Sequence, residues 1–586
     1  GKPAGFLAHL GSHIPKHLGL LHRLQVWVCF VRKWQGFLFG FRFFHSGLSL
    51  FLGKGSRKEG GSDNLQGTRR LEPFAPRPYD GTVQRLGIVD LGSGTARLVV
   101  YAYEPGRHFR LIDEIRETVR LGEGLATQGR LSERGIQRAL SALKLYADFA
   151  QATDLGELRV IATSASRDAE NGPEFLREVR KLGLQVQVLS GEEEARYGVL
   201  AVANSFNFQD AWVMDLGGGS AQLSRMQARL YQSGQAYPLG AVRLTEMFIK
   251  SNPPKKGEIA DLERFVRKEM KAVLAQMRQA PLPLVAMGGT VRNLAKLAQR
   301  RQDYPLDLVH GYFLTREALE EVVTLLAQRP LEQRRALEGL QSDRADVIVA
   351  GGLVYRTVLR ETGLEGLWIS GQGVREGAFY RAFLPPPHLL SDVRGFYVRN
   401  LFAHYPQDYG HTARVGHFCR LLFRLLEPLH GYGKAEEQLL DEAALLHDIG
   451  MSIGYYDHHK HGEYLVMSAA IPGLSHREQA LLGLLVRYHR KGQPRPGAYP
   501  SVLQEGDNKR LLRLATILRL SEYLERSRVG RVEGLEVALG SRQVRLTLLA
   551  QEEPWVELAE TRKQAKLFQQ AFGRELLVEW EPRGAP

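Results

Sequence analysis

The sequence predicts an α/β protein built from two similar lobes, followed by an all-helical region and a small α/β appendage. Two stretches carry the same apolar strand, aspartate and glycine turn: "IVDLGSGTARL" at residues 88–98 and "VMDLGGGSAQL" at residues 213–223. Between and after them, strand-like runs alternate with helical patterns, which is typical of α/β folds. Beyond "FLPPPHLLSD" at residues 383–392 the apolar period becomes that of long amphipathic helices.

The elements follow in order from this reading. Residues 133–150 have helical spacing, "LRVIATSAS" is a strand, and "LQVQVLSGEEEARYGVLAVANS" is a strand that leads into a helix. "LPLVAMGGTVRNLAKLA" repeats the strand, glycine and helix order a third time. "RADVIVAGGLVYRTVLRETG" is a helix with a glycine after its end, and "GLWISGQGVREGAFY" is a last strand and turn. Later helices are expected at 411–429, 435–447, 475–490 and 508–527, and "LEVALGSRQVRLTLLA" alternates like a hairpin.

These elements predict the domain organisation of the 586-residue chain. We expect a first lobe at 83–198, to which 376–385 returns, a second lobe at 199–375, a helical domain at 392–530 and the appendage at 531–586. Residues 1–82 hold 12 Lys/Arg against 4 Asp/Glu and so carry +8 of the net charge of +14. We interpret them as a basic leader, either disordered or mistranslated upstream of a native start at Val83; the alternative is a basic interfacial anchor.

The composition limits where the protein is expected to be located and which substrates suit it. The leader's apolar stretch is broken by Arg32, Lys33 and Arg42, so no integral membrane span is expected. Cys29 and Cys419 are the two cysteines of the chain, which provides no disulfide framework and favours a reducing, cytoplasmic location. The mildly basic body suits a polyanionic substrate, and nothing in it specifically indicates nucleic acid.

Paired glycine turns predict an anion site. Small residues after a strand let backbone N–H groups converge on one point, which favours phosphate. Asp90 and Asp215, at the ends of the two strands, cannot donate to phosphate at neutral pH; their expected work is to hold Mg²⁺ or to orient water. With Gly288, Gly289 and Thr290 as a third turn, two facing lobes would hold a phosphate chain between them.

Together these motifs resemble the Ppx/GppA family of exopolyphosphatases and guanosine pentaphosphate (pppGpp) phosphatases. The resemblance rests on "DLGSGTARLVV", "VIATSASRDAENGPEFL", "LSGEEEARYG", "DLGGGSAQL", "PLGAVRLTEMF", "AMGGTVRNLAKL", "RADVIVAGG" and "GQGVREG", in order from about Val83 to Phe383. It implies two actin-like lobes of the acetate kinase, sugar kinase, heat-shock chaperone and actin superfamily. It also implies Mg²⁺-dependent release of a terminal phosphoryl group, and a homodimer.

The resemblance also implies particular residues. Glu194, the last acid of "SGEEEAR", matches the family's catalytic base, although acids also suit a helix N-terminus for their interaction with the dipole. Asp215 and Gln222 join it as catalytic residues. The expected phosphate-binding set is Gly92, Ser93, Gly94, Thr95, Arg97, Arg167, Gly217, Gly218, Gly219, Ser220, Gly288, Gly289 and Thr290. Arg344 and Asp346 match another segment near the cleft, and a helix-capping or salt-bridge role is equally open for them.

Two positions depart from the family pattern. The family usually has Asn where the first turn here has Gly94, which removes at most one side-chain contact. The second turn usually continues Ser-Thr-Glu, and this chain has Ser220, Ala221 and Gln222. Gln222 keeps a carbonyl oxygen but not the charge, so weaker Mg²⁺ binding is expected.

The helical region resembles an HD domain. His411, the pair His447 and Asp448 in "LLHDIG", and Glu522 in "LRLSEYLERSR" are expected to converge on a second divalent metal, with Glu522 where the family has Asp. His461 and His489 match positions that some HD domains use for a further metal or for substrate, and surface or packing roles are the alternative. Whether this domain is catalytic, binds polymer or only packs is left open.

The predicted function is release of terminal phosphate from inorganic polyphosphate by Mg²⁺-assisted attack of water. The first alternative is a pppGpp phosphatase that uses the same site. A second is a polyphosphate- or nucleotide-binding sensor with weak catalysis, which Gln222 favours. A kinase of the same superfamily is disfavoured, because "SGEEEAR" supplies a base for water and no acceptor-sugar motif is evident.

Overall fold

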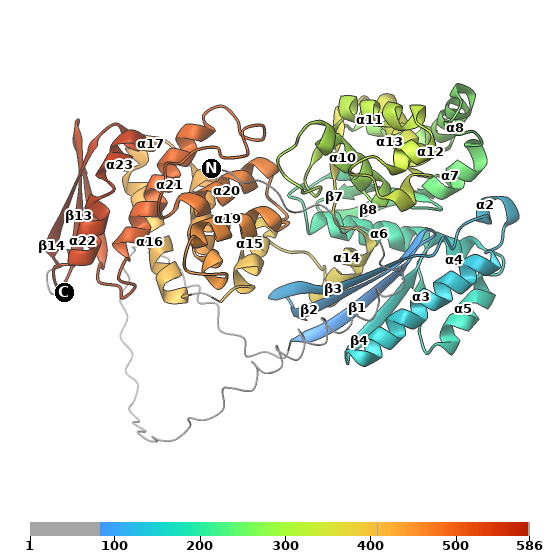
Figure 1. The fold of residues 1–586 in the computed structure, drawn as a ribbon, viewed down its shortest axis with the longest axis horizontal. Coiled ribbons are helices and arrows are strands. Elements are labelled where there is room, and N and C mark those ends of the chain that lie inside the picture. The colour runs from blue at the N-terminus through green and yellow to red at the C-terminus, as the bar shows by residue number, and fades with distance from the viewer. Residues whose placement is uncertain (1–82, 407, 584–586) are drawn as a thin grey trace, which may run out of the picture. The chain divides into compact units, whose positions relative to one another are not determined.

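The fold is that of a computed structural model, which describes residues 83–406 and 408–583. The expectations for the leader at 1–82 therefore lie outside the described residues. Mixed sheets and many helices make up the chain (Figure 1). The first sheet has the strand order β3-β2-β1-β4-β5, and its strands are β1 (Gln84–Leu91), β2 (Thr95–Glu104), β3 (His108–Thr118), β4 (Glu157–Ala162) and β5 (Val186–Val188).

A second sheet repeats this plan. Its order is β10-β11-β9-β6-β7-β8, and its strands are β6 (Ala211–Leu216), β7 (Ala221–Gln227), β8 (Leu230–Tyr237), β9 (Leu284–Met287), β10 (Phe313–Thr315) and β11 (Gly366–Ile369). In both sheets three consecutive antiparallel strands are followed by a parallel neighbour of the first strand. The antiparallel second and third strands were missed in the sequence, where strands were expected to alternate with helices.

The duplicated register places corresponding residues at corresponding points. Asp90 of β1 pairs with Arg97 of β2, and Asp215 of β6 pairs with Gln222 of β7. The hairpin turns are closed alike, by a backbone hydrogen bond of 3.0 Å from Gly92 to Thr95 and one of 2.9 Å from Gly217 to Ser220. The repeat seen in the sequence is therefore a repeat of backbone geometry.

Strand alternation decides what covers the first sheet. Leu86 and Ile88 of β1 belong to one apolar core, and Val89 and Leu91 to another, because successive side chains point to opposite faces. The face with Val89 packs against α3 (Glu133–Ala152) and α5 (Gly172–Lys181). The opposite face packs against α14 (Val374–Phe383), whose Phe379 stacks on Tyr101 with ring centroids 4.0 Å apart.

Further helices surround these sheets. The helix α6 (Gly191–Ala203) packs against α14 so closely that a Cβ on Gly377 would lie 2.1 Å from the carbonyl oxygen of Tyr197. The almost wholly buried α13 (Ile348–Thr362) lies at the centre of the second core and ends at Gly363 in the left-handed region. The others are α2 (Leu125–Gln128), α4 (Ser164–Asp168), α7 (Ala241–Phe248), α8 (Lys256–Glu269), α9 (Lys271–Gln279), α10 (Gly289–Arg301), α11 (Arg316–Gln328), α12 (Leu331–Arg335) and the 3₁₀ turn η1 (Ser342–Arg344).

The part of the chain after residue 392 is helical up to residue 524. Its elements are α15 (Val393–Ala403), α16 (Tyr409–Leu425), α17 (Glu427–His430), α18 (Lys434–Leu446), η2 (Ile449–Ser452), α19 (His458–Ser468), α20 (His476–Tyr488) and α21 (Asp507–Leu524). The four expected helices correspond to α16, α18, α20 and α21, while α15 and α19 were not foreseen. Phe109 of β3 contacts Phe396 and Tyr397 of α15, so this helical part and the first sheet share one apolar core.

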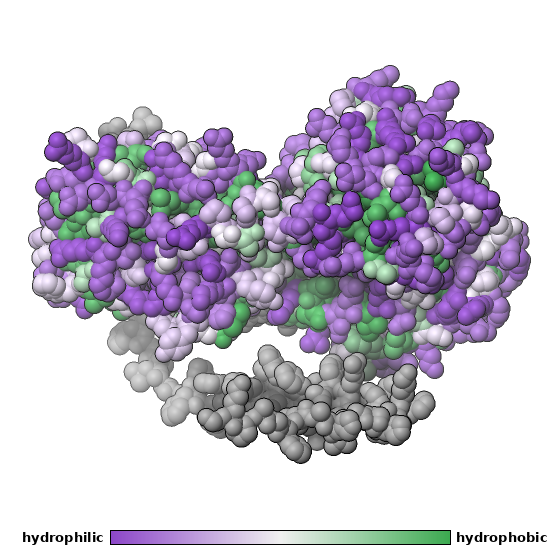
Figure 2. All heavy atoms as spheres, turned by 45° about the horizontal axis from the view of Figure 1, so that its top comes forward, coloured by the Kyte–Doolittle hydropathy of each residue, from purple (hydrophilic) through white to green (hydrophobic). Residues whose placement is uncertain are grey.

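The last described segment is a three-stranded sheet with two helices. The expected hairpin is β12 (Gly534–Leu539) and β13 (Gln543–Ala550), and β14 (Glu575–Pro582) runs parallel to β13. The crossover between β13 and β14 contains α22 (Trp555–Arg562) and α23 (Ala565–Phe572). Within the described residues, none of the helices combines the length and apolarity that a membrane crossing requires. Hydrophilic side chains cover most of the face seen in Figure 2, with apolar ones interspersed.

Candidate active site

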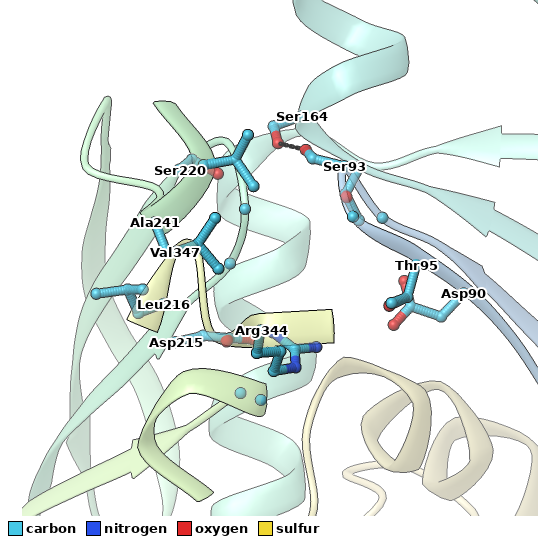
Figure 3. A pocket seen from close by; sticks show the side chains of 18 of the residues that line it. Asp90, Ser93, Thr95, Ser164, Asp215, Leu216, Ser220, Ala241, Arg344 and Val347 are labelled. Carbon is cyan, nitrogen blue, oxygen red and sulfur yellow. Dashed lines mark hydrogen bonds between the residues drawn. The ribbon is translucent and has the colours of Figure 1, made fainter. Parts of the chain in front are cut away.

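A cavity of about 340 Å³ lies where the glycine turns of the two sheets meet. The turn after β1 and the turn after β6 both line it, and the start of α10 adds the third turn (Figure 3). From the predicted phosphate-binding set, the lining residues are Gly92, Ser93, Gly94, Thr95, Arg97, Gly217, Gly218, Ser220, Gly288 and Gly289. The duplicated motifs thus come together around one space.

The two turns approach each other so closely that only glycine fits. A Cβ on Gly218 would lie 3.0 Å from the Cβ of Ser93, and one on Gly219 would lie 2.6 Å from the Ser164 hydroxyl. The Ser93 and Ser164 hydroxyls are hydrogen-bonded at 3.1 Å (Figure 3). The close contact with the first lobe therefore explains why Gly218 and Gly219 have no side chain, whether or not they also bind an anion.

Three carboxylates lie around the cavity, of which Glu194 is buried and Asp90 and Asp215 are half-buried. Burial is the main cause that raises the pKa of Asp90, and the charge of Arg375 partly offsets it. Burial, followed by the charge of Asp90, raises the pKa of Asp215 to about 6. Burial also raises the pKa of Glu194 to about 7, while its hydrogen bond from Arg167 opposes the rise. These groups are costly to ionise together, and a cation in the cavity would reduce that cost.

Local structure fixes Glu194 at the cavity. Ser190 and Glu193 form a capping box, in which each side chain binds the other residue's backbone N–H, so the helix α6 starts at a defined point. Glu194 lies on the inner side of this first turn, while Glu192 is exposed and paired with Arg196. The helix N-terminus reading is thus correct for Glu193, whereas Glu194 is buried at the cavity.

The residues present fit a Mg²⁺ ion that is bound jointly with substrate. Asp90 and Asp215 lie at separate points of the cavity (Figure 3), and the tight ligand clusters of the described residues do not include them. Mg²⁺ is usually held by one or two carboxylates, water and substrate phosphates rather than by an all-protein cage. Oxygen donors at Asp90 and Asp215 beside an anion-binding cavity match that pattern.

Arginines bring positive charge to the same cavity. The lining includes Arg97, Arg120, Arg292, Arg344 and Arg375. Burial lowers the pKa of Arg97 to about 10, and Arg292 is fixed by donation to the carbonyl oxygens of Gly288 (3.1 Å) and Gly371 (2.9 Å). Sequence reasoning singled out Arg97 and Arg344 but not Arg292 or Arg375. Both stand a few residues after a glycine turn, in "GGTVRN" and "GQGVREG", which is the signal that could have found them.

The structure differs from expectation at three members of the phosphate-binding set. Arg167, Gly219 and Thr290 do not line the cavity. Arg167 instead donates through Nη1 to Glu194 Oε2 at 2.9 Å and to the carbonyl of Leu189 at 2.7 Å. Its geometry is that of a residue that positions Glu194. Asp346 does line the cavity and forms an ion pair of 3.0 Å with Arg120, in agreement with the salt-bridge reading.

Gln222 contacts the carboxylate of Glu194. Its side chain is buried, and its Nε2 donates to Glu194 Oε2 at 3.2 Å and to the Ser220 hydroxyl at 2.9 Å. A glutamate here would place another negative charge against Glu194. The amide therefore links the second glycine turn to the candidate base without adding charge.

The expected metal ligands of the helical part also come together. Glu522 Oε2 lies 3.0 Å from His411 Nε2 and 3.3 Å from His447 Nε2, and Asp448 is adjacent. His489 is also in this cluster. The histidine that accompanies it is His458 rather than His461: His458 is buried, with its Nε2 3.4 Å from Asp448 Oδ1, whereas His461 is half-buried.

Comparison with known proteins places the chain in a family. The Ppx/GppA phosphatase family matches residues 99–385, and domain III of the Ppx/GppA phosphatases matches residues 393–570. Exopolyphosphatase 1 of Mycobacterium tuberculosis (strain H37Rv) is 32% identical over 302 residues, which are 51% of this chain and 88% of that protein. Exopolyphosphatase 1 of Mycobacterium bovis matches with the same identity and coverage. The chain belongs to the Ppx/GppA phosphatase family and is a hydrolase of that family.

Solved structures are similar to about half of the chain. The Aquifex aeolicus family member is 32% identical, with 51% of this chain and 97% of that one covered and a TM-score of 0.44. An exopolyphosphatase from Cytophaga hutchinsonii is 22% identical, with 51% and 98% covered and a TM-score of 0.49. Both TM-scores are below 0.5, so the family assignment rests on the sequence matches.

Removing the charge of Glu194 should abolish phosphate release. Glu194→Gln keeps the shape but cannot accept a proton from water, so we expect a loss of at least about 100-fold in kcat, the typical contribution of a general base. Glu192→Gln, on the exposed side of the same helical turn, is the matched control and should retain wild-type release. Equal rates of phosphate release for the two variants would show that Glu194 is not the general base.

Acidification should reduce phosphate release through the pKa of Glu194. The base must be ionised, and because its pKa is raised to about 7, the active fraction is present above that pH and lost below it. Arg167→Gln removes the hydrogen bond that lowers this pKa, so the acid limb of the kcat profile should move to higher pH. A profile that is unchanged by Arg167→Gln would contradict the positioning role.

Proposed function

We propose that this protein is an exopolyphosphatase, which releases terminal phosphate from inorganic polyphosphate with the help of Mg²⁺. The observation that carries the proposal is the meeting of three glycine turns, three carboxylates of raised pKa and several arginines around one cavity. Backbone N–H groups and arginines suit a chain of phosphates, and carboxylates suit water and Mg²⁺.

In the proposed reaction the turns after β1 and β6 bind the terminal phosphates from two sides. Glu194 accepts a proton from water, whose oxygen attacks the terminal phosphorus in line. The bond from that phosphorus to the bridging oxygen breaks, so orthophosphate leaves and the polymer is one unit shorter. Arg97, Arg292 and Arg375 stabilise the charge that develops on the phosphoryl oxygens. Mg²⁺, held at Asp90 and Asp215, would neutralise phosphate charge and orient the chain.

A second substrate is supported by the apolar part of the lining. Val347, which is partly exposed, lines the cavity, and the buried residues Leu216 and Ala241 contribute to its wall near Asp215 (Figure 3). Polyphosphate has no apolar group that could contact Val347, whereas pppGpp has its base and ribose. The pppGpp phosphatase is therefore the alternative activity of the same site. A sensor with weak catalysis is the third candidate, supported by the uncharged Gln222.

The resemblance and the composition support the remaining proposals. We propose an actin-like arrangement of the two lobes, an HD-type helical domain with bound metal, and a cytoplasmic homodimer. Light scattering on the full chain tests the last of these, and a monomer at micromolar concentration would contradict it.

Phosphate release should be measured from long-chain polyphosphate and from pppGpp, with Mg²⁺, for wild type and Gln222→Glu. We expect wild-type release from polyphosphate, and a higher rate at limiting Mg²⁺ for Gln222→Glu because it adds a carboxylate beside the cavity. Gln227→Glu, exposed on the same strand, is the matched control and should equal wild type.

The other outcomes identify the alternatives. Preferential phosphate release from pppGpp would identify the protein as a pppGpp phosphatase. Tight polyphosphate binding without wild-type release, with activity gained in Gln222→Glu, would assign a sensor built on a phosphatase scaffold.

A further inference from the structure

A row of three charged residues crosses the first sheet, starting beside its glycine turn. Asp90 of β1 is paired with Arg97 of β2, and Arg97 is paired with Arg116 of β3. Directly paired residues of neighbouring strands point to the same face, so these three side chains lie on one side of the sheet. Neighbouring strands are about 4.8 Å apart, which places Arg116 roughly 10 Å from Asp90. The row therefore leads from a carboxylate of the cavity to an arginine that the proposed reaction does not use.

A carboxylate of the second lobe lies at the far end of this row. Asp343 of η1 accepts hydrogen bonds at Oδ2 from the guanidinium group of Arg116 and, at 3.2 Å, from the hydroxyl group of Thr118. Thr118 and Asp343 both line the cavity. Burial raises the pKa of Asp343, but the charge of Arg116 and its hydrogen bond outweigh this effect and hold the pKa below its ordinary value. Asp343 is therefore a negative charge held against the first lobe.

Two arginines beside Asp343 have hydrogen-bonding capacity to spare. The Nε atoms of Arg116 and Arg344 are both buried and have no hydrogen-bond partner within the described residues. Arg344 lines the cavity (Figure 3) and lies so close to the third glycine turn that a Cβ on Gly289 would be 2.3 Å from its Cζ. Burial, followed by the charge of Arg116, lowers the pKa of Arg344. Buried donors in proteins nearly always have an acceptor, so a further anion is expected at this point.

Asp343 has the chemistry of a substitute for phosphate. Carboxylate and phosphate oxygens both accept paired hydrogen bonds from a guanidinium group. A polyphosphate chain that extends from the glycine turns along the row would bring phosphate oxygens to Arg116, where the carboxylate of Asp343 lies. Two anions cannot occupy one place, and their like charges repel. A chain of this length can therefore bind Arg116 only by displacing Asp343.

We propose that Asp343 is a specificity-determining residue, which mimics a substrate phosphate at Arg116 and is displaced by polyphosphate chains long enough to reach it. This inference rests on the proposed function, since it requires that the two turns hold the end of a polyphosphate chain. Short chains held by the turns alone leave the ion pair between Asp343 and Arg116 intact. Longer chains lose part of their binding free energy in displacing Asp343, and they gain Arg116 and Arg344 as phosphate ligands.

The test is the binding of tripolyphosphate and of long-chain polyphosphate to the full chain, with Mg²⁺ and in the Glu194→Gln parent so that hydrolysis is blocked. Isothermal titration calorimetry gives the Kd of each ligand. Asp343→Asn should lower the Kd of long-chain polyphosphate about fivefold, because it removes the competing charge. Arg116→Gln should raise that Kd by a similar factor, because it removes a phosphate ligand. The Kd of tripolyphosphate should change less than about twofold in both variants.

The opposite signs separate competition from a purely structural role. An ion pair that only joined the two lobes would be lost in either variant, and both variants would then change the Kd in the same direction. Asp343→Ser removes the same charge with a different side chain and should repeat the effect of Asp343→Asn. Asp261→Asn and Arg264→Gln, which disrupt an exposed ion pair on α8, are the matched controls and should leave both Kd values unchanged.

The contrary results are distinct from a failure of the proposed function. A long-chain Kd that is unchanged in Asp343→Asn and Asp343→Ser would show that Asp343 does not compete with phosphate. Equal shifts for the two ligands would place Asp343 at the terminal phosphates and overturn its role in chain-length selection. In both cases the parent protein still binds polyphosphate, so the proposed function stands. A parent protein that binds no polyphosphate would contradict the proposed function and this inference together.

Discussion

The gathering of three carboxylates with raised pKa values around one cavity is the constraint that the α/β part of this protein has to satisfy. The pKa values of Asp215 and Glu194 are raised to about 6 and 7, above those of the unfolded chain. The folded state therefore loses stability as the pH rises from the ordinary pKa values of these groups to about 6 for Asp215 and about 7 for Glu194. The surrounding arginines reduce this cost, and a divalent cation with its phosphate ligand would reduce it further. A cavity of this kind is stabilised by the species that it binds.

The duplicated hairpins explain how two short and similar segments of the chain form such a cavity. Each hairpin fixes an aspartate at the end of a buried strand and a glycine turn beside it, and the cross-strand partner of that aspartate decides the local chemistry. Arg97 fills this position in the first sheet, where it contributes positive charge. Gln222 fills it in the second, where it contacts Glu194. The two halves of the site are alike in backbone and different in electrostatics.

The sequence was sufficient for features that depend on local pattern. The glycine turns, Glu194 at a helix start and the helices α16, α18, α20 and α21 were all predicted, because each has a strand, cap or helical period of its own. Features that depend on packing between distant segments were not. Arg292 and Arg375 reach the cavity only because their glycine turns face it. His458 could not be told from His461, since only the packing of α19 against the other helices shows that His458 is buried and His461 half-buried.

A second lesson concerns Arg167, which the family motif placed at the phosphate and the structure places against Glu194. An arginine near a glycine turn can bind either a substrate phosphate or a carboxylate of the protein. The carboxylate is present whether or not substrate is bound. The helical part makes the same point with histidines. Their outer bonds to carbonyl groups, invisible in the sequence, decide that their lone pairs converge.

The central claim is that the two hairpin turns bind one phosphate chain together. Its most direct test is a crystal structure of Glu194→Gln with Mg²⁺ and tripolyphosphate, in which hydrolysis is blocked. The account predicts phosphate oxygens in contact with the turn at residues 92–95 and the turn at residues 217–220 at once, with Mg²⁺ at Asp90 or Asp215. Tripolyphosphate bound at one turn alone, or outside the cavity, would contradict it.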